Sequence, residues 1–145
     1  MRTRTFLVAG AAILAGSCAE MPKMEPMTTQ SCTGTCDVYV TIAAGCAIQP
    51  VDPVHVAPGT HVVKWSMVKG TPNRYSFAPN GIEFASSSAP FDDPQHPGPQ
   101  VFTLRDTNPG DPRYGLEKAW KYTITVLDGG VPCLDPLDPY VINDP

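Results

Sequence analysis

The feature that most constrains the fold of this chain is an alternating stretch at residues 54–68. In its second half one face carries lysine and serine, and the other is apolar: Val63, Trp65 and Met67. A period of two residues indicates a half-buried β-strand. Because proline and glycine interrupt the pattern at 58–59, the stretch predicts two strands around a turn.

A second stretch repeats this pattern closer to the C-terminus. Trp120, Tyr122, Ile124 and Val126 share one face, with lysine and threonine between them. Two amphipathic strands that each place a tryptophan on the apolar face predict two sheets that close on one another. Seventeen prolines and twelve glycines separate many short alternating segments, so the sequence predicts an all-β sandwich.

Shorter segments fill the rest of the predicted domain. They lie at residues 37–44, 74–78, 82–85 and 101–104, with turns at 70–73 and 79–81. The four prolines within residues 86–99 predict a loop. The last segment, residues 133–143, is expected to run extended and to pack four apolar side chains against the core: Leu134, Leu137, Tyr140 and Ile142.

The N-terminus is organised like a secretory signal peptide. Arg2 and Arg4 precede a short apolar run at residues 6–14, and small residues follow it. The run is too short to cross a bilayer as a stable helix. Residues 1–17 are therefore predicted to be removed on export.

Cys18 comes directly after these small residues. The segment Leu14-Ala15-Gly16-Ser17-Cys18 resembles a bacterial lipobox, which implies that the cysteine is acylated and becomes the mature N-terminus. Ala19 resembles the residue that sorts Gram-negative lipoproteins to the outer membrane. The alternative is ordinary cleavage after Ala19. The favoured interpretation is an exported protein of the periplasm or cell surface, anchored to the outer membrane by lipid on Cys18.

The cysteine count favours a lipidated Cys18. Five cysteines leave one unpaired in an exported chain, whereas lipidation leaves an even set: Cys32, Cys36, Cys46 and Cys133. Four cysteines in an oxidising compartment predict two disulfides with three possible connectivities, all of which the sequence leaves open. We favour Cys46 with Cys133 and Cys32 with Cys36. A redox or metal-binding role for Cys32 and Cys36 is an alternative, but their spacing is not Cys-x-x-Cys.

Residues 18–31 are predicted to form a flexible, lipid-anchored linker, because they contain two prolines and no apolar period. Met21, Met24 and Met27 recur in this linker at every third position. Thioethers are suitable ligands for Cu(I), so the alternative interpretation is a copper-handling segment. The folded domain is expected to span residues 32–145.

Part of this domain resembles a cupredoxin. The matching segments are Val54-His-Val56, Pro58-Gly-Thr60, Val63-Lys-Trp65, Tyr75-Ser-Phe77 and the closing strand Tyr122-Thr-Ile124-Thr-Val126. The resemblance implies a Greek-key β-sandwich. The copper ligands of that family do not carry over, since no histidine stands near Arg74 and none follows Cys133. No cofactor is therefore expected.

His55 and His61 flank the predicted turn and, if they faced each other, would make an alternative metal site with His96 or Asp52. The simpler interpretation is that both are polar residues on the solvent side of a hairpin.

The remaining motifs point away from catalysis and nucleic acids. No Gly-x-Ser-x-Gly or glycine-rich phosphate loop is present. Without Arg2 and Arg4, eight basic and fourteen acidic side chains remain, a net charge near −6, which argues against a nucleic-acid partner. The sequence predicts a non-catalytic cell-envelope lipoprotein that acts through protein or envelope contacts. The alternative is periplasmic copper handling through the three methionines or His55 and His61.

Overall fold

The computed structural model describes residues 30–110, 118–133 and 137–145. Within these ranges the fold is all-β: two sheets pack face to face, and the chain forms no α-helix. None of the helical turns in this part of the chain has the length and apolar character needed to cross a membrane. The predicted fold class is thus confirmed at the level of an all-β sandwich with two disulfides.

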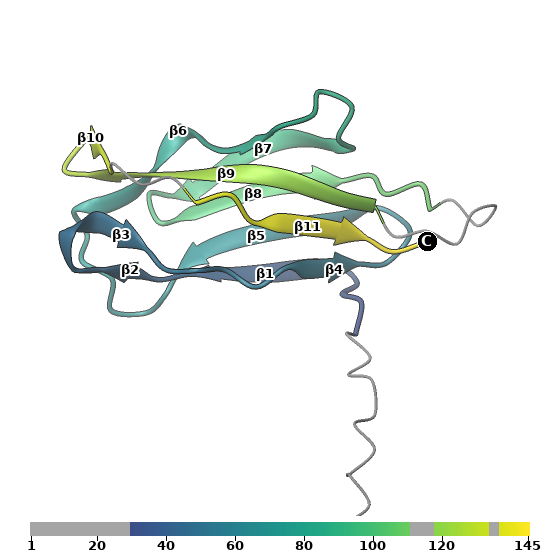
Figure 1. The fold of residues 1–145 in the computed structure, drawn as a ribbon, viewed down its shortest axis with the longest axis horizontal. Helices are drawn as coiled ribbons and strands as arrows, with labels where there is room; N and C mark the ends of the chain where they lie inside the picture. The colour runs from purple at the N-terminus through teal and green to yellow at the C-terminus, as the bar shows by residue number, and fades with distance from the viewer. Residues whose placement is uncertain (1–29, 111–117, 134–136) are drawn as a thin grey trace, which may run out of the picture.

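The first sheet contains four strands in the order β1-β5-β8-β7 (Figure 1). Their bounds are Thr35–Val40 for β1, His61–Met67 for β5, Val101–Asp106 for β8 and Phe91–Gly98 for β7. β1 runs parallel to β5, and the other neighbours are antiparallel.

The second sheet is built around β9, its longest strand. Its members are β4 (Val54–Val56), β6 (Tyr75–Phe84), β9 (Lys118–Asp128), β10 (Val131–Pro132) and β11 (Tyr140–Asn143). β9 pairs with β6, β10 and β11, and β11 pairs in parallel with β4. A short hairpin of β2 (Ile42–Ala43) and β3 (Ala47–Ile48), joined by the 3-10 turn η1 (Ala44–Cys46), lies outside both sheets.

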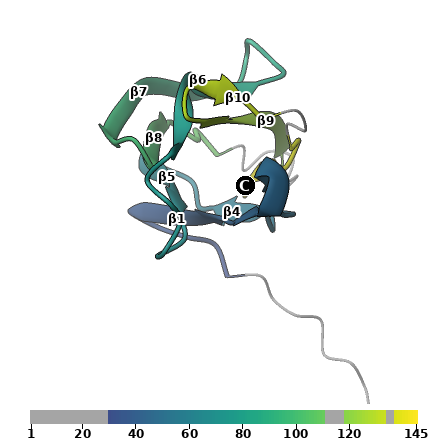
Figure 2. The same cartoon turned by 90° about the vertical axis from the view of Figure 1, so that its left-hand side faces the viewer.

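The core lies between the two sheets, as the paired tryptophan strands predict. Seen end-on, the strands surround one interior (Figure 2). Trp65 of β5 is completely buried and meets Tyr122 of β9 edge-on, with ring centroids 5.4 Å apart. Phe102 of β8 packs against Trp65 from within the first sheet, at 6.4 Å. Aromatic pairs in this geometry contribute beyond the area they bury, so this cluster joins the sheets.

The predicted hairpin at residues 54–68 is wrong. β4 and β5 do not pair with each other: β4 joins the second sheet beside β11, and β5 joins the first between β1 and β8. The turn at Pro58 and Gly59 carries the chain from one sheet to the other. Gly59 has φ 127°, and a Cβ there would lie 3.2 Å from the His61 ring. Alternation reports which face is buried, but not which strand lies alongside.

Two further predictions fail where proline or glycine suggested a turn. The predicted turn at 79–81 lies inside β6, whose register against β9 shifts between Phe77 and Ile82. Proline, asparagine and glycine here mark a β-bulge rather than a chain reversal. The predicted loop at 86–99 contains β7, an edge strand with two prolines, Pro94 and Pro97. An edge strand tolerates proline because its outer N–H groups have no ladder partner.

The C-terminal segment runs extended, as predicted, but it turns a different face to the core. After β10 the chain continues along β9, with Ile124 N–H donating to Leu137 O and Tyr122 N–H donating to Pro139 O. Leu137 packs against the core, whereas Tyr140 is 42% exposed and Val141 is fully buried instead. Leu134 lies outside the described residues.

Candidate functional site

One end of the sandwich gathers the N-terminal entry, the turn after β4 and the C-terminus. We call this end the entry site and define it by residues 31–36, 55–61, 106–110 and 143–145. In it the N-terminal segment changes sheets. Cys32 first bridges to β4, donating its N–H to His55 O and accepting from Ala57 N–H, at 2.8 and 3.0 Å. Two residues later Gly34 O accepts from Val62 N–H of β5, at 2.8 Å.

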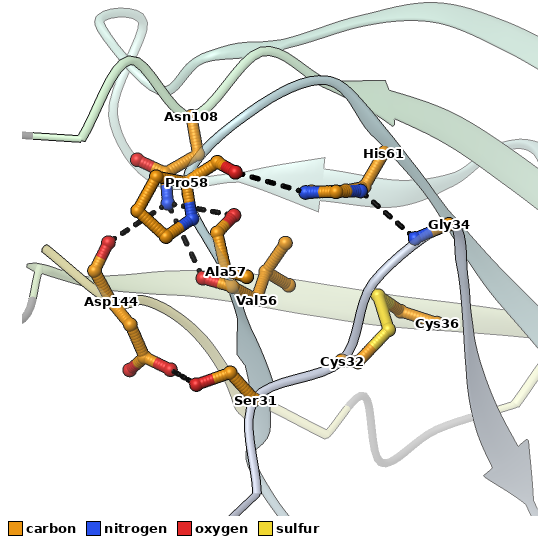
Figure 3. The surroundings of a disulfide bond; sticks show 10 residues. All are labelled: Ser31, Cys32, Gly34, Cys36, Val56, Ala57, Pro58, His61, Asn108 and Asp144. Atoms are coloured by element: carbon orange, nitrogen blue, oxygen red, sulfur yellow. Dashed lines mark hydrogen bonds between the residues drawn. A yellow bond between two sulfur atoms is a disulfide. The ribbon is translucent and has the colours of Figure 1, made fainter.

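A disulfide closes this crossing. Cys32 and Cys36 are joined across four residues, so the bond links the bridge on β4 to the buried start of β1 (Figure 3). Gly34, between them, has φ 79°, a conformation that favours glycine. A second disulfide joins Cys46, at the end of η1, to Cys133 after β10. This is the connectivity that we favoured from the sequence, and it uses all four cysteines of the predicted domain.

Asn108 is the polar hub of the entry site. Its side-chain Nδ2 donates to three backbone carbonyls, those of Val56, Ala57 and Asp144, at 3.3, 3.2 and 3.0 Å. Its Oδ1 accepts from Gly110 N–H at 3.0 Å. Asn108 is 4% exposed, so these bonds lie away from solvent. Figure 3 shows the amide reaching both the turn after β4 and the C-terminal residues. One side chain therefore ties the two chain segments together.

Ser31, Asp144 and His55 form a chain of polar contacts nearby, but not a catalytic triad. The Ser31 hydroxyl donates to Asp144 Oδ2, and His55 Nδ1 lies 3.0 Å from Asp144 Oδ1. In a triad the serine must bond the histidine, which takes up its proton. Here both side chains bond the carboxylate, so the serine is not paired with the histidine. The contacts instead attach residue 31 to the C-terminus.

The histidines that could have formed a metal site have separate partners. His55 contacts Asp144, whereas His61 accepts the Gly34 N–H at Nδ1, 2.9 Å away, and its Nε2 faces Pro58 O at 3.3 Å. His96 lies on β7, with Nε2 2.9 Å from Pro79 O of β6. Across residues 30–110, 118–133 and 137–145, no three His, Cys, Asp or Glu side chains converge on a point. Cys18, Met21, Met24 and Met27 lie outside the described residues.

A cavity of about 260 Å³ opens beside Asn108, the polar hub of the entry site. Its lining includes Trp120, Asn143, Lys118 and three prolines: Pro90, Pro109 and Pro145. The Lys118 ammonium lies over the Trp120 ring, 4.2 Å from its centroid. Trp120 is buried, and its indole N–H has no hydrogen-bond partner in the described parts of the chain. The cavity is thus lined by prolines and an indole ring together with polar and charged residues.

A buried carboxyl–amide pair adjoins the cavity. Asn143 Nδ2 donates to Asp106 Oδ1 at 3.2 Å, and both side chains are buried. Burial raises the pKa of Asp106 to about 6, against the opposing effects of Asn143, the Asn108 backbone amide and His61.

Sequence reasoning missed these polar residues, although a signal for Asp106 was present. It follows Phe102 and Leu104 at a spacing of two, on the face that β8 buries. Asn108 carried no such signal, because an asparagine before proline and glycine is also typical of a surface turn.

Comparison with known proteins adds no assignment. No protein-family model matches the chain, and no curated protein matches it at a significant level.

Proposed function

We propose that this protein is a non-catalytic cell-envelope lipoprotein: a disulfide-stapled β-sandwich domain, exported and held to the membrane by lipid on Cys18, that acts through contacts with an envelope partner. The proposal extends to a Greek-key, cupredoxin-like arrangement of the two sheets that has no copper site. The single observation that carries it is the pairing of the cysteines.

That pairing leaves one cysteine out. The two disulfides join Cys32 to Cys36 and Cys46 to Cys133, and the chain contains five cysteines. An exported protein with one leftover thiol is exposed to wrong pairing. The leftover residue is Cys18, which follows the apolar run and the small residues of a lipobox-like segment. Acylation of its sulfur removes the thiol and supplies the anchor in one step.

The structure of the entry site fits attachment by a tether. Residues 31–36 are fixed by β-bridge bonds to β4, by the Ser31–Asp144 contact and by a disulfide. A force applied through the linker would therefore meet a segment tied to both sheets. The lack of a serine–histidine contact at Ser31, whose hydroxyl bonds the Asp144 carboxylate, favours binding over catalysis.

The sandwich also fits the cupredoxin-like interpretation without its metal. The strand that carries Trp65 and the strand that carries Tyr122 lie in facing sheets. The histidines that remain bond to Asp144, Gly34 and Pro79. Donors already engaged in this way are poorly placed to hold a redox metal.

A cysteine replacement tests the anchor. In the bacterial envelope, Cys18→Ser should release the domain into the soluble fraction, whereas a matched Ser17→Ala variant should stay with the membranes. Export and both disulfides should persist in each variant, as measured by mass spectrometry without reductant. Unchanged membrane fractionation of the Cys18→Ser protein would refute the lipid anchor.

A further inference from the structure

The pair of Asp106 and Asn143 joins the two sheets through a single hydrogen bond. Asp106 ends β8 of the first sheet, and Asn143 ends β11 of the second. Asp106 is fully buried and Asn143 is 4% exposed. The bond between them runs from Asn143 Nδ2 to Asp106 Oδ1 at 3.2 Å. It is therefore a direct link between the C-terminal strand and the opposite sheet.

Each residue of this pair has one oxygen left over. Asp106 Oδ2 and Asn143 Oδ1 are buried, and neither has a hydrogen-bond partner of ordinary geometry in the part of the chain that the structure describes. The Asn108 backbone N–H acts on the Asp106 carboxyl and lowers its pKa, but it makes no bond of that geometry. An ionised carboxylate has no proton to donate, so both leftover atoms would be acceptors. Buried acceptors without a donor are costly. One proton on Asp106 Oδ2 would turn that oxygen into a donor on the same carboxyl group to which Asn143 Nδ2 already donates.

We propose that in mild acid Asp106 is protonated in the folded domain and that its proton completes a two-bond acid–amide clasp with Asn143, which holds the C-terminal strand to the first sheet more tightly in acid than at neutral pH. In the clasp Asn143 Nδ2 donates to Asp106 Oδ1, and Asp106 Oδ2–H donates to Asn143 Oδ1. Deprotonation removes the second bond and leaves a charge in the interior. The clasp does not depend on how the chain is anchored.

Burial acts in the direction that the clasp requires. It raises the pKa of Asp106 from an ordinary value of 3.8 to about 6. The folded state therefore takes up a proton that the unfolded chain has already lost. This stabilisation is fully present below pH ~4, declines as the pH rises toward ~6, and is absent above that.

Other groups near the clasp also titrate, so wild-type stability alone would be ambiguous. His61 of β5 lies opposite Asp106 on one side, and Phe91 of β7, which has no titratable group, lies opposite it on the other. Lys118 of β9 lies opposite Asn143. His61 accepts the Gly34 N–H at Nδ1. Nearby, Asp144 contacts His55, and the exposed Arg105 next to Asp106 pairs with Asp92.

The test compares unfolding free energies of three full-length, disulfide-intact proteins from pH 4 to 8: wild type, Asp106→Asn and Asp93→Asn. In Asp106→Asn the new amide supplies a permanent donor in place of Oδ2, so its stability should lose this pH dependence. Relative to that variant, the wild-type folding constant should fall about 60-fold between pH 4 and 7. Asp93→Asn, which neutralises an exposed carboxylate, should keep the wild-type profile.

Parallel profiles for wild type and Asp106→Asn would overturn the proposal, and so would an Asp106→Asn protein that does not fold, because the clasp predicts that a neutral amide is accepted there. A second readout is independent of stability. Carbon-13 titration of the aspartate carboxyls should show one group that titrates near pH 6. Titration of every aspartate below about pH 4.5 would contradict the clasp.

Discussion

Trp65 and Tyr122 meet edge-on between the two sheets, with their ring centroids 5.4 Å apart and their planes at 71°. Each comes from a strand whose alternation is clear in the sequence, and both are almost completely buried. The Trp65 indole N–H and the Tyr122 hydroxyl have no hydrogen-bond partner in the described ranges. Burial raises the pKa of Tyr122 to about 12, although the Trp65 side chain opposes this. Since neither atom has a partner of ordinary hydrogen-bond geometry, the polar contact from Trp65 to the Tyr122 hydroxyl is weak, and the two side chains meet mainly by packing.

Removing the Tyr122 hydroxyl should leave the stability of the domain almost unchanged. Because that oxygen is buried without a partner, Tyr122→Phe should change the unfolding free energy by less than about 0.5 kcal/mol, or stabilise the domain. Trp65→Ala, which empties the centre of the core, should cost about 3–5 kcal/mol. Urea unfolding of both variants checks this difference. A loss of more than about 1.5 kcal/mol in Tyr122→Phe would mean that the hydroxyl is bonded.

The two disulfides should contribute unequally. The Cys46–Cys133 bond closes a loop of 87 residues, whereas Cys32–Cys36 spans only four. On loop entropy alone, the long loop is worth about 4–5 kcal/mol and the short one about 2. Urea unfolding of the Cys46→Ala/Cys133→Ala and Cys32→Ala/Cys36→Ala proteins measures both. A larger loss in the second protein would show that the strand crossing, rather than the long loop, dominates stability.

Asn108 should contribute more to the stability of the domain than Gln100, a less buried residue with a similar set of hydrogen bonds. Gln100 also donates to three carbonyls, those of Thr71, Pro72 and Tyr75, but it is half-buried. Loss of the Asn108 amide leaves buried carbonyls without that donor, so Asn108→Ala should cost about 2–3 kcal/mol and Gln100→Ala about 1. Thermal unfolding of both variants provides the comparison. Equal losses of unfolding free energy in the two variants would contradict the role of Asn108 as the hub of the entry site.

The prolines of β7 should keep the domain from pairing through that edge. Pro94 and Pro97 lack N–H groups on a strand that has β8 on only one side. A Pro94→Thr/Pro97→Thr protein should therefore form dimers or larger species at concentrations where the wild type does not. Light scattering detects this change, with the exposed loop variant Pro50→Thr as control. A monomeric double variant would show that another feature protects the edge.

The sequence predicted those parts of the fold that depend on local pattern. Trp65 and Trp120 mark strands whose alternation is uninterrupted, and both strands are found in facing sheets. The partner of each strand was not predictable, because β1–β5 and β4–β11 are parallel pairs between segments far apart in the chain. β7 was not predicted because it contains Pro94, and a strand accepts proline there only because it lies at the edge of the sheet.

Less of the entry site was predictable. The preferred cysteine pairing followed from counting and from the expected course of the chain. The link from Asn108 to the C-terminus joins residues 36 positions apart, and no local motif encodes it. Asp106 was missed as well, because the predicted strand ended at residue 104, although its spacing of two from Phe102 and Leu104 is the pattern of the face that β8 buries.

The most direct test of the lipoprotein account is the intact mass of the protein extracted from membranes without reductant. The account predicts a chain that begins at Cys18 and carries acyl groups on that residue, with two disulfides and no free thiol. A mature chain that begins after Ala19, or one that retains an unmodified Cys18 thiol, would contradict it.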